Sequence, residues 1–265
     1  VRLKTDKGYI LDLTTNHEVC RVSQVNGKQK FQWIPAGDLK DGDSIRLNNH
    51  RGIEIDKDVK YDVGWLLGSL IGDGTFTRDS VSDTADLRFW GPSGEAMAKM
   101  AFSLIDSTGI QRRSDMKPNY NDTNDFWQVG CVQFANLAKS YGLIPAEKTI
   151  TPLMERETDS FVCGILSGLF DADGSVMGNH EKGISVRLSQ SNLETLRAAQ
   201  RMLLRVGIVS TLYQNRRVAG YRKMPDGQGG MSEYYCQAQH ELSVSNDNLF
   251  RFQEVIGFRE PSKSF

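Results

Sequence analysis

Two aspartates, Asp73 and Asp173, stand at equivalent points of two similar segments and could together bind a metal ion. Each ends an apolar run and precedes a glycine, in YDVGWLLGSLIGDGTF from Tyr61 and in DSFVCGILSGLFDADGSV from Asp159. A carboxylate at a helix C-terminus is disfavoured by the helix dipole, and two carboxylates brought together repel or share a proton. A hard cation such as Mg²⁺, which takes oxygen ligands, removes that repulsion. The pair therefore predicts a Mg²⁺ site that could activate water and hydrolyse a phosphodiester.

Three other interpretations apply to these segments. The aspartates could simply end two core helices, although the repetition of the pattern argues against this. Asp171 and Asp173 begin like a calcium-binding loop. However, Val176 stands where that loop needs glycine, and Lys182 stands where it needs glutamate. A nucleotide-binding loop is disfavoured because neither run follows a G-x-G-x-x-G turn.

Two long helices must position these acids. Both runs are apolar nearly all round, which predicts helices buried on more than one side. We expect the first helix to be capped at Asp62 and the second at Asp159 or Ser160. Gly74 and Gly174 suit left-handed C-terminal caps. Small residues on or near one face of each helix would let the two approach closely and bring the carboxylates together: Gly68, Gly72, Gly168 and Ala172.

The similarity continues beyond the two Asp-Gly pairs. Each is followed by two strand-like runs, an amphipathic helix ending in Gly-Ile, two further strands and a last helix, so each copy reads α-β-β-α-β-β-α. Lys148 follows Gly142 by six residues, and Lys263 follows Gly257 by the same interval. The second copy is longer around residues 215–232, a glycine-rich basic stretch that predicts a long hairpin.

The composition is that of a soluble globular chain. It has 265 residues, of which 39% are hydrophobic and 25% charged, and no apolar run is long enough for a membrane span. We expect a cytoplasmic protein with four reduced cysteines, since none are spaced as C-x-x-C. The net charge of −1 does not favour a polyanionic partner, but basic residues gather around 112–117 and 216–223. A neutral protein can bind DNA through one such face.

The segment LSGLFDADG at residues 166–174 resembles the signature of the LAGLIDADG homing endonucleases, and LLGSLIGDG at residues 66–74 resembles its variant in inteins. Ile71 replaces the family's first aspartate in the first copy. The family's metal-binding acid falls on Asp73 and Asp173, which both copies keep.

The resemblance implies an α+β fold in which two pseudo-symmetric αββαββα repeats, residues 59–157 and 158–265, form one monomer. The paired helices would lie at its centre, and two four-stranded sheets would make a saddle on double-stranded DNA. The metal would be Mg²⁺, with Ca²⁺ as a non-cleaving substitute. Its ligands would be the two aspartates and backbone groups near Gly72 and Ala172. The implied function is site-specific double-strand cleavage at a long asymmetric target.

Three further residues match functional positions of the family. Lys148 and Lys263 fall where the family often has a basic residue near the scissile phosphates, where a lysine could stabilise transition-state charge. Gln190 falls where the family often has a polar residue near metal-bound water, and the first copy offers Trp90 or Gly91 there. The residues expected to read DNA from the sheets are Arg78, Arg88, Arg112, Gln128, Arg187, Gln190, Tyr213, Arg216, Arg217, Arg222, Lys223, Gln237 and Gln239.

Residues 1–58 predict short strands and resemble part of the splicing (Hint) domain of inteins. Thr14 and His17 match a block that polarises the scissile amide in that family, and WIPAGDLKDGD at residues 33–43 matches the strand and turn that follow. The chain begins at Val1 and ends at Phe265, without the splice-junction residues, so we expect no splicing from it.

A second interpretation keeps the same saddle without catalysis, as a DNA- or RNA-binding protein of maturase or regulator type. The loss of one acid would favour it. Because both Asp73 and Asp173 are present, the sequence favours an intein-derived endonuclease.

Overall fold

The computed structural model describes residues 1–48, 50–78, 82–145, 147–179, 181, 183–227 and 229–263, and the side chain of Arg78 lies outside the described residues. No helix in these ranges is long and apolar enough to cross a membrane. One continuous hydrophobic core joins both repeats. A second, small core lies in the N-terminal segment.

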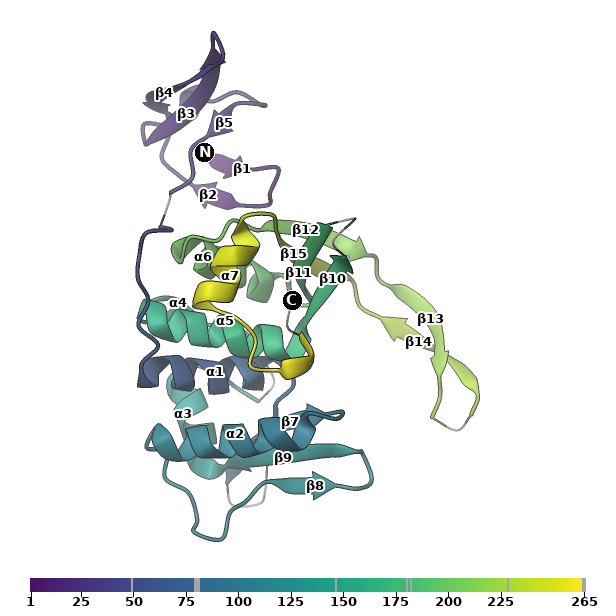
Figure 1. The fold of residues 1–265 in the computed structure, drawn as a ribbon. Helices are drawn as coiled ribbons and strands as arrows, with labels where there is room; N and C mark the ends of the chain where they lie inside the picture. Colours follow the sequence, from purple (N-terminus) through teal and green to yellow (C-terminus); the bar gives the residue numbers. More distant parts are fainter. Residues whose placement is uncertain are drawn as a thin grey trace.

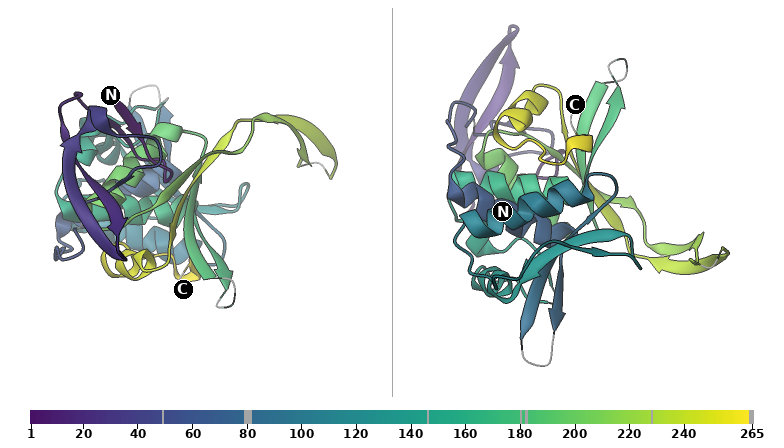
Figure 2. Two further views of the ribbon diagram at one scale, coloured as in Figure 1. Left: turned by 90° about the horizontal axis from the view of Figure 1, so that it is seen from above. Right: turned by 60° about the horizontal axis from the view of Figure 1, so that its bottom comes forward.

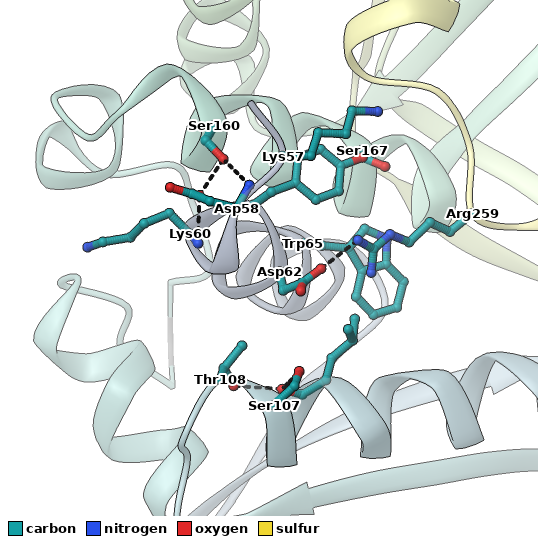
Figure 3. Close-up of polar contacts among 12 residues, drawn as sticks. Lys57, Asp58, Lys60, Asp62, Trp65, Ser107, Thr108, Ser160, Ser167 and Arg259 are labelled. Atoms are coloured by element: carbon teal, nitrogen blue, oxygen red, sulfur yellow. Dashed lines mark hydrogen bonds and ion pairs between the residues drawn. The ribbon is translucent and has the colours of Figure 1, made fainter. Parts of the chain in front are cut away.

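Two helices, α1 (Val59–Gly72) and α5 (Asp159–Asp173), pack side by side at the centre of the molecule (Figure 1). Their N-caps differ from the predicted ones. The Asp58 carboxylate caps α1 by accepting from the backbone N–H of Lys60, and the Thr158 hydroxyl caps α5 by accepting from that of Phe161. Asp58 also accepts from the Ser160 hydroxyl at 2.6 Å, which ties the start of one helix to the other (Figure 3).

Four glycines allow this close helix contact. A Cβ atom at Gly68 would lie 2.1 Å from a backbone oxygen of α5, and one at Gly168 would lie 2.2 Å from a backbone oxygen of α1. Gly64 and Gly164, which the sequence analysis did not single out, are as tightly placed, at 2.3 and 2.0 Å. Any larger residue would force the helices apart, so glycine is required here by packing.

Gly74 and Gly174 do not form the predicted left-handed caps. The φ of Gly174 is −78°, and that of Gly74 is not positive either. Both glycines instead leave the helix directly into a strand. Added Cβ atoms would come within 2.6 Å of the Leu70 Cα and 2.4 Å of the Phe170 oxygen in the preceding turns.

Each repeat builds a four-stranded antiparallel sheet, as predicted, and helices cover one face of each sheet. In repeat 1 the sheet order is β6-β7-β9-β8, and in repeat 2 it is β10-β11-β15-β12. Figure 1 shows the two sheets on either side of the central helix pair. The elements of repeat 1 are β6 (Thr75–Arg78), β7 (Asp83–Trp90), α2 (Gly94–Ser107), β8 (Asn119–Asn121), β9 (Phe126–Cys131) and α3 (Val132–Ser140). The corresponding elements of repeat 2 are β10 (Gly174–Asn179), β11 (Gly183–Gln190), α6 (Leu193–Arg205), β12 (Thr211–Arg217), β15 (Gln239–Ser245) and α7 (Asn248–Val255).

Three further elements complete the two repeats. The short helix α4 (Pro152–Glu155) joins them, and the 3₁₀ turn η2 (Pro261–Lys263) follows α7. The predicted long hairpin consists of β13 (Gly220–Pro225) and β14 (Met231–Cys236), which form a separate two-stranded sheet.

The N-terminal segment is a small all-β unit, as predicted. Its elements are β1 (Arg2–Lys4), β2 (Ile10–Asp12), β3 (Glu18–Val25), β4 (Lys28–Pro35), the 3₁₀ turn η1 (Ala36–Asp38) and β5 (Ser44–Ile45). It contacts repeat 2, since the backbone oxygen of Lys7 accepts from the N–H of Leu212 at 2.9 Å and from the Gln200 amide at 2.8 Å.

Candidate active site

The end of the helix pair brings the two acidic positions together. Asp73 caps the C-terminus of α1, and Asp173 is the last residue of α5. A Cβ atom at Gly72 would lie 2.4 Å from the Cβ of Ala172 and 3.0 Å from an Oδ atom of Asp173. The Asp173 carboxylate therefore lies directly against the end of α1, on the seam between the repeats.

Partial burial makes both carboxyl groups hard to ionise, and the charge of Asp73 adds to this effect at Asp173. Burial, reinforced by the nearby charge of Asp73, raises the pKa of Asp173 from 3.8 to about 6. Burial also raises the pKa of Asp73, against the opposing effect of Lys263 and Lys148. A cation that binds both carboxylates would relieve this cost, because it replaces the lost solvation and screens the repulsion.

Lys148 lies at the C-terminus of α1. Its Nζ donates to the backbone oxygens of Leu70 and Gly72, each at 3.3 Å, and also to that of Gly74. A cation at this position stabilises the exposed carbonyl groups of the helix end. Burial lowers the pKa of Lys148, while the carboxylates of Asp173 and Asp73 act in the opposite direction.

Lys263 makes the equivalent contacts at the C-terminus of α5. Its Nζ donates to the backbone oxygens of Phe170 at 3.4 Å and Ala172 at 3.0 Å, and also to that of Asp171. Burial lowers the pKa of Lys263 as well. The equal spacing of the two lysines in the sequence thus corresponds to a pseudo-symmetric pair, each lysine on the helix end of its own repeat.

Comparisons with known proteins concern the fold that carries this site. Residues 160–257 match the family model of the LAGLIDADG-like domain. The structure is similar to that of I-WcaI bound to its DNA recognition sequence, with a TM-score of 0.50 and 12% identity over 81% of this chain and 88% of that one. It is equally similar to I-DmoI in complex with DNA and Ca, with a TM-score of 0.50 and 14% identity over 77% of this chain and 94% of that one.

The fold is that of the LAGLIDADG homing endonucleases.

Two curated relatives are similar along almost the whole chain. They are the NrdEB subunit alpha of the ribonucleoside-diphosphate reductases of Bacillus subtilis (strain 168) and of Bacillus phage SPbeta. Each is 26% identical over 98% of this chain, and the chain spans 24% of their length.

The two halves of this candidate site are unequal. Gln190 donates to an Oδ of Asp173 at 2.5 Å, so it fixes the orientation of that carboxylate. Strand register identifies its counterpart in repeat 1. The equivalent residues Thr75 and Ser175 pair with Asp86 and Arg187, so Gln190, three residues after Arg187, is equivalent to Phe89. The predicted counterparts, Trp90 and Gly91, were therefore wrong, and an apolar ring that stacks on Trp65 occupies this position.

Asp171, the first aspartate of the LAGLIDADG motif in repeat 2, has a structural role that the sequence analysis did not identify. Its buried carboxylate accepts from the Trp65 indole at 2.7 Å and from the backbone N–H groups of Arg259 and Glu260, each at 3.0 Å. Arg259 also pairs with Asp62 on α1 at 2.6 Å (Figure 3). These contacts anchor the segment that carries Lys263. The corresponding Ile71 in repeat 1 is packed in the core.

Apart from Gln190, the candidate DNA-reading residues placed by strand alternation fall on the faces of the sheets that point away from the covering helices. Gln190 lies on the same face of β11 as the buried Leu188 and contacts Asp173, so its assignment to the DNA-reading face was wrong. In β7, Ala85 and Leu87 are buried against the core, so Arg88 points to the opposite face, where it pairs across the ladder with Gln128. In β11, Leu188 is buried, so its neighbours Arg187 and Ser189 point outward. Cross-strand register places Tyr213, Gln239 and Glu241 on the same outward face.

Other predicted readers lie outside the four-stranded sheets or at the ends of their strands. Arg112 lies in the connection after α2, stacks on Phe102 and pairs with Asp106 at 2.5 Å. Its assignment to the sheet was wrong. Gln237 lies between β14 and β15. The remaining assignments are Arg216 and Arg217 at the end of β12, Arg222 and Lys223 on β13, and Arg78, whose side chain lies outside the described residues.

Thr14 and His17 lie together in one exposed turn of the N-terminal segment. The N–H of His17 donates to the oxygen of Thr14 at 3.2 Å, and the oxygen of His17 accepts from the N–H of Ala36 at 2.7 Å. The second predicted splicing block, residues 33–43, thus packs against the first. A cavity of about 580 Å³ adjoins this region, lined in part by Ala36 and Asp43.

Proposed function

We propose that this chain is a site-specific, divalent-metal-dependent DNA endonuclease that makes double-strand breaks. The observation that carries the proposal is the juxtaposition of Asp73 and Asp173, each followed in its own repeat by a lysine on the helix end. A core helix pair alone does not explain two half-buried acids whose pKa values are raised and which lie at the same end of the pair. Perturbed acids of this kind are characteristic of functional sites.

The donor set fits a hard cation, for which we propose Mg²⁺, with Ca²⁺ as a non-cleaving substitute. The two carboxylates and the backbone oxygens near Gly72 and Ala172 are all oxygen ligands. No group of three or more His, Cys, Asp or Glu side chains that could hold a metal occurs in the described part of the chain, which disfavours a closed structural site. When bound, the cation would activate water and stabilise the leaving oxygen of a phosphodiester.

Five side chains of the protein would have separate roles in this reaction. Asp73 and Asp173 bind the cation in their ionised forms, and Gln190 holds the orientation of the Asp173 carboxylate. Lys148 and Lys263 supply positive charge beside the two acids, where charge develops on the phosphate during hydrolysis. Their contacts with helix-end carbonyls hold each ammonium in place before DNA binds.

The substrate we propose is duplex DNA lying across the outward faces of the two sheets. Arg88 with Gln128 in one repeat, and Arg187 with Gln239 in the other, present the donors and acceptors that read base edges in the major groove. I-WcaI and I-DmoI share the fold, and they are described as bound to a DNA recognition sequence and as in complex with DNA and Ca, respectively. The repeats differ in sequence, so the target should be long and asymmetric, and one chain supplies both halves of the site.

We also propose an intein origin. The reductase relatives match this chain over only about a quarter of their own length, as expected if the matching region is a segment carried inside a longer polypeptide. The turn with Thr14 and His17, packed against residues 33–43, supports a partial splicing domain. Incubation of the purified chain, followed by mass spectrometry, tests the accompanying expectation of no self-splicing. A spliced product formed without a second polypeptide would contradict it.

Cleavage selection on a randomised duplex library, with and without Mg²⁺, tests the function. The proposal predicts recovery of one long site, cut in both strands only when a divalent cation is present. Retention of a specific duplex without any cut would instead identify a catalytically inactive binding protein with the same saddle.

A further inference from the structure

The hairpin of β13 and β14, here called the arm, projects from repeat 2. Its strands pair along their whole length, from Gly220 with Cys236 to Pro225 with Met231, and they belong to no larger sheet. The arm continues from β12 and β15, which are paired at Arg217 and Gln239. Figures 1 and 2 show it extending well beyond the body of the molecule.

Apolar and aromatic side chains lie exposed on both faces of the arm. Tyr221 and Tyr235 are opposite each other on one face, with ring centroids 5.4 Å apart, and are 73% and 62% exposed. Their strand neighbours Arg222 and Tyr234 are paired on the other face. An isolated two-stranded hairpin has little stability of its own, and a ribbon with this much exposed aromatic surface is typical of an interaction site.

The charge of the arm favours a polyanion as the partner. Arg216, Arg217, Arg222 and Lys223 outnumber the acids of the same stretch, Asp226 and Glu233. Within the described ranges, neither Arg217 nor Arg222 has an ion-pair partner, and Arg222 donates to the backbone oxygen of Val218 at 3.0 Å at the base of the arm. The arm also emerges from the sheet whose outward face carries the candidate base readers. Its partner should therefore be the molecule that lies on that sheet.

We propose that the arm lies in a groove of the duplex that flanks the saddle on the side of repeat 2. This inference rests on the proposed function. A major groove about 12 Å wide admits a two-stranded ribbon. The basic side chains would contact phosphates, and the tyrosines would pack against the sugars and groove edges. In repeat 1 the equivalent hairpin closes with residues 122–125 between β8 and β9, so the arm makes the footprint longer on one side only.

The test measures the affinity of the protein for duplexes that contain the library-selected site, in the absence of divalent metal. One duplex carries a flank of about 20 base pairs, two helical turns, on each side of the site, and two shorter duplexes each lack one flank. For the unchanged chain, removal of one flank should weaken binding about tenfold, and removal of the other should have little effect. The double variant Arg222→Gln/Lys223→Gln should bind the full duplex about tenfold more weakly. The affinity of this variant should no longer depend on the flank. The slope of the logarithm of its binding constant against the logarithm of the salt concentration should be shallower by about 1.8, because two phosphate contacts are lost.

The double variant Lys28→Gln/Lys30→Gln is the matched control, because it removes the same charge from another exposed hairpin, β3–β4, and should behave like the unchanged chain. Equal sensitivity of the arm variant and the unchanged chain to flank removal would overturn the proposal. Concentration-dependent dimerisation through the arm in sedimentation, lost in Tyr221→Ser, would also overturn it by assigning the arm to a second copy. If the unchanged chain cuts its selected site but the arm substitutions leave binding unaltered, the proposal for the arm is wrong and the proposed function stands. If the unchanged chain cuts no member of the library, the proposed function is wrong.

Discussion

The substitution Asp173→Asn should stabilise the metal-free protein at neutral and alkaline pH. The folded state holds the pKa of Asp173 at about 6, mainly by burial and then by the charge of Asp73, against an ordinary value of 3.8. This difference corresponds to about 3 kcal/mol, since a tenfold change in proton affinity is worth about 1.4 kcal/mol. Asparagine keeps an oxygen that can accept from Gln190 but carries no charge.

The sign follows from proton linkage. The folded state binds the proton of Asp173 more tightly than the unfolded state does, so the stabilising effect of that proton is complete below pH 3.8. It is lost as the pH rises through about 6, the folded value. The stability advantage of Asp173→Asn should therefore grow between these two values and level off at about 3 kcal/mol above them. In a chain of this size that corresponds to about 6–10 °C in Tm.

Urea or thermal unfolding followed by circular dichroism, at pH values from acid to mildly alkaline, measures this difference directly. Addition of Mg²⁺ at high pH should stabilise the unchanged chain, because a ligand that binds only the folded state adds to its stability, and should have much less effect on the variant. A variant that is less stable at high pH, or whose advantage does not change with pH, would show that Asp173 does not carry an unfavourable charge in the folded state.

Two other predictions concern the lysines and the helix seam. Lys148→Met and Lys263→Met should each lower the single-turnover cleavage rate by about 100-fold while duplex binding stays within a few-fold, and Lys99→Met, at an exposed ion pair on α2, should cleave normally. If the two lysine variants lose no more cleavage rate than the control variant, Lys148 and Lys263 do not take part in catalysis. Gly168→Ala should destabilise the fold by about 3 kcal/mol, because the added Cβ would lie 2.2 Å from a backbone oxygen of α1. The control Gly220→Ala, whose Cβ would meet no atom within 4 Å, should change the free energy of unfolding by less than about 1 kcal/mol in the same assay. Equal stability of the two alanine variants would contradict the packing argument.

Local pattern accounts for much of what the sequence could predict. Helices that are apolar all round must be buried on more than one side, and their repetition with the same downstream order implies a pseudo-symmetric pair. That reasoning placed Asp73 and Asp173 at matched helix ends. The sequence named Arg88 and Arg187 as candidate readers but left their faces open, and the burial of the neighbouring Leu87 and Leu188 places both on the outward faces.

The predictions that were wrong or missing concern residues whose position depends on strand register or on contacts with residues far away in the chain. The counterpart of Gln190 is Phe89 and not Trp90, because pairing with β6 shifts the comparison by one residue, and a one-residue shift changes the face. Asp171 acts through N–H groups of Arg259 and Glu260, far away in the chain, which no local pattern indicates. Gly74 and Gly174 were assigned left-handed caps from residue type alone, whereas close packing against the preceding turn explains their lack of a side chain.

Cleavage of the library-selected duplex by the unchanged chain and by Asp73→Asn and Asp173→Asn tests the central claim most directly. With Mg²⁺, the account predicts that the unchanged chain cuts both strands, and that both variants bind the duplex with similar affinity but fail to make a double-strand break. Double-strand cleavage by both variants at the rate of the unchanged chain would show that the paired aspartates are not the active site.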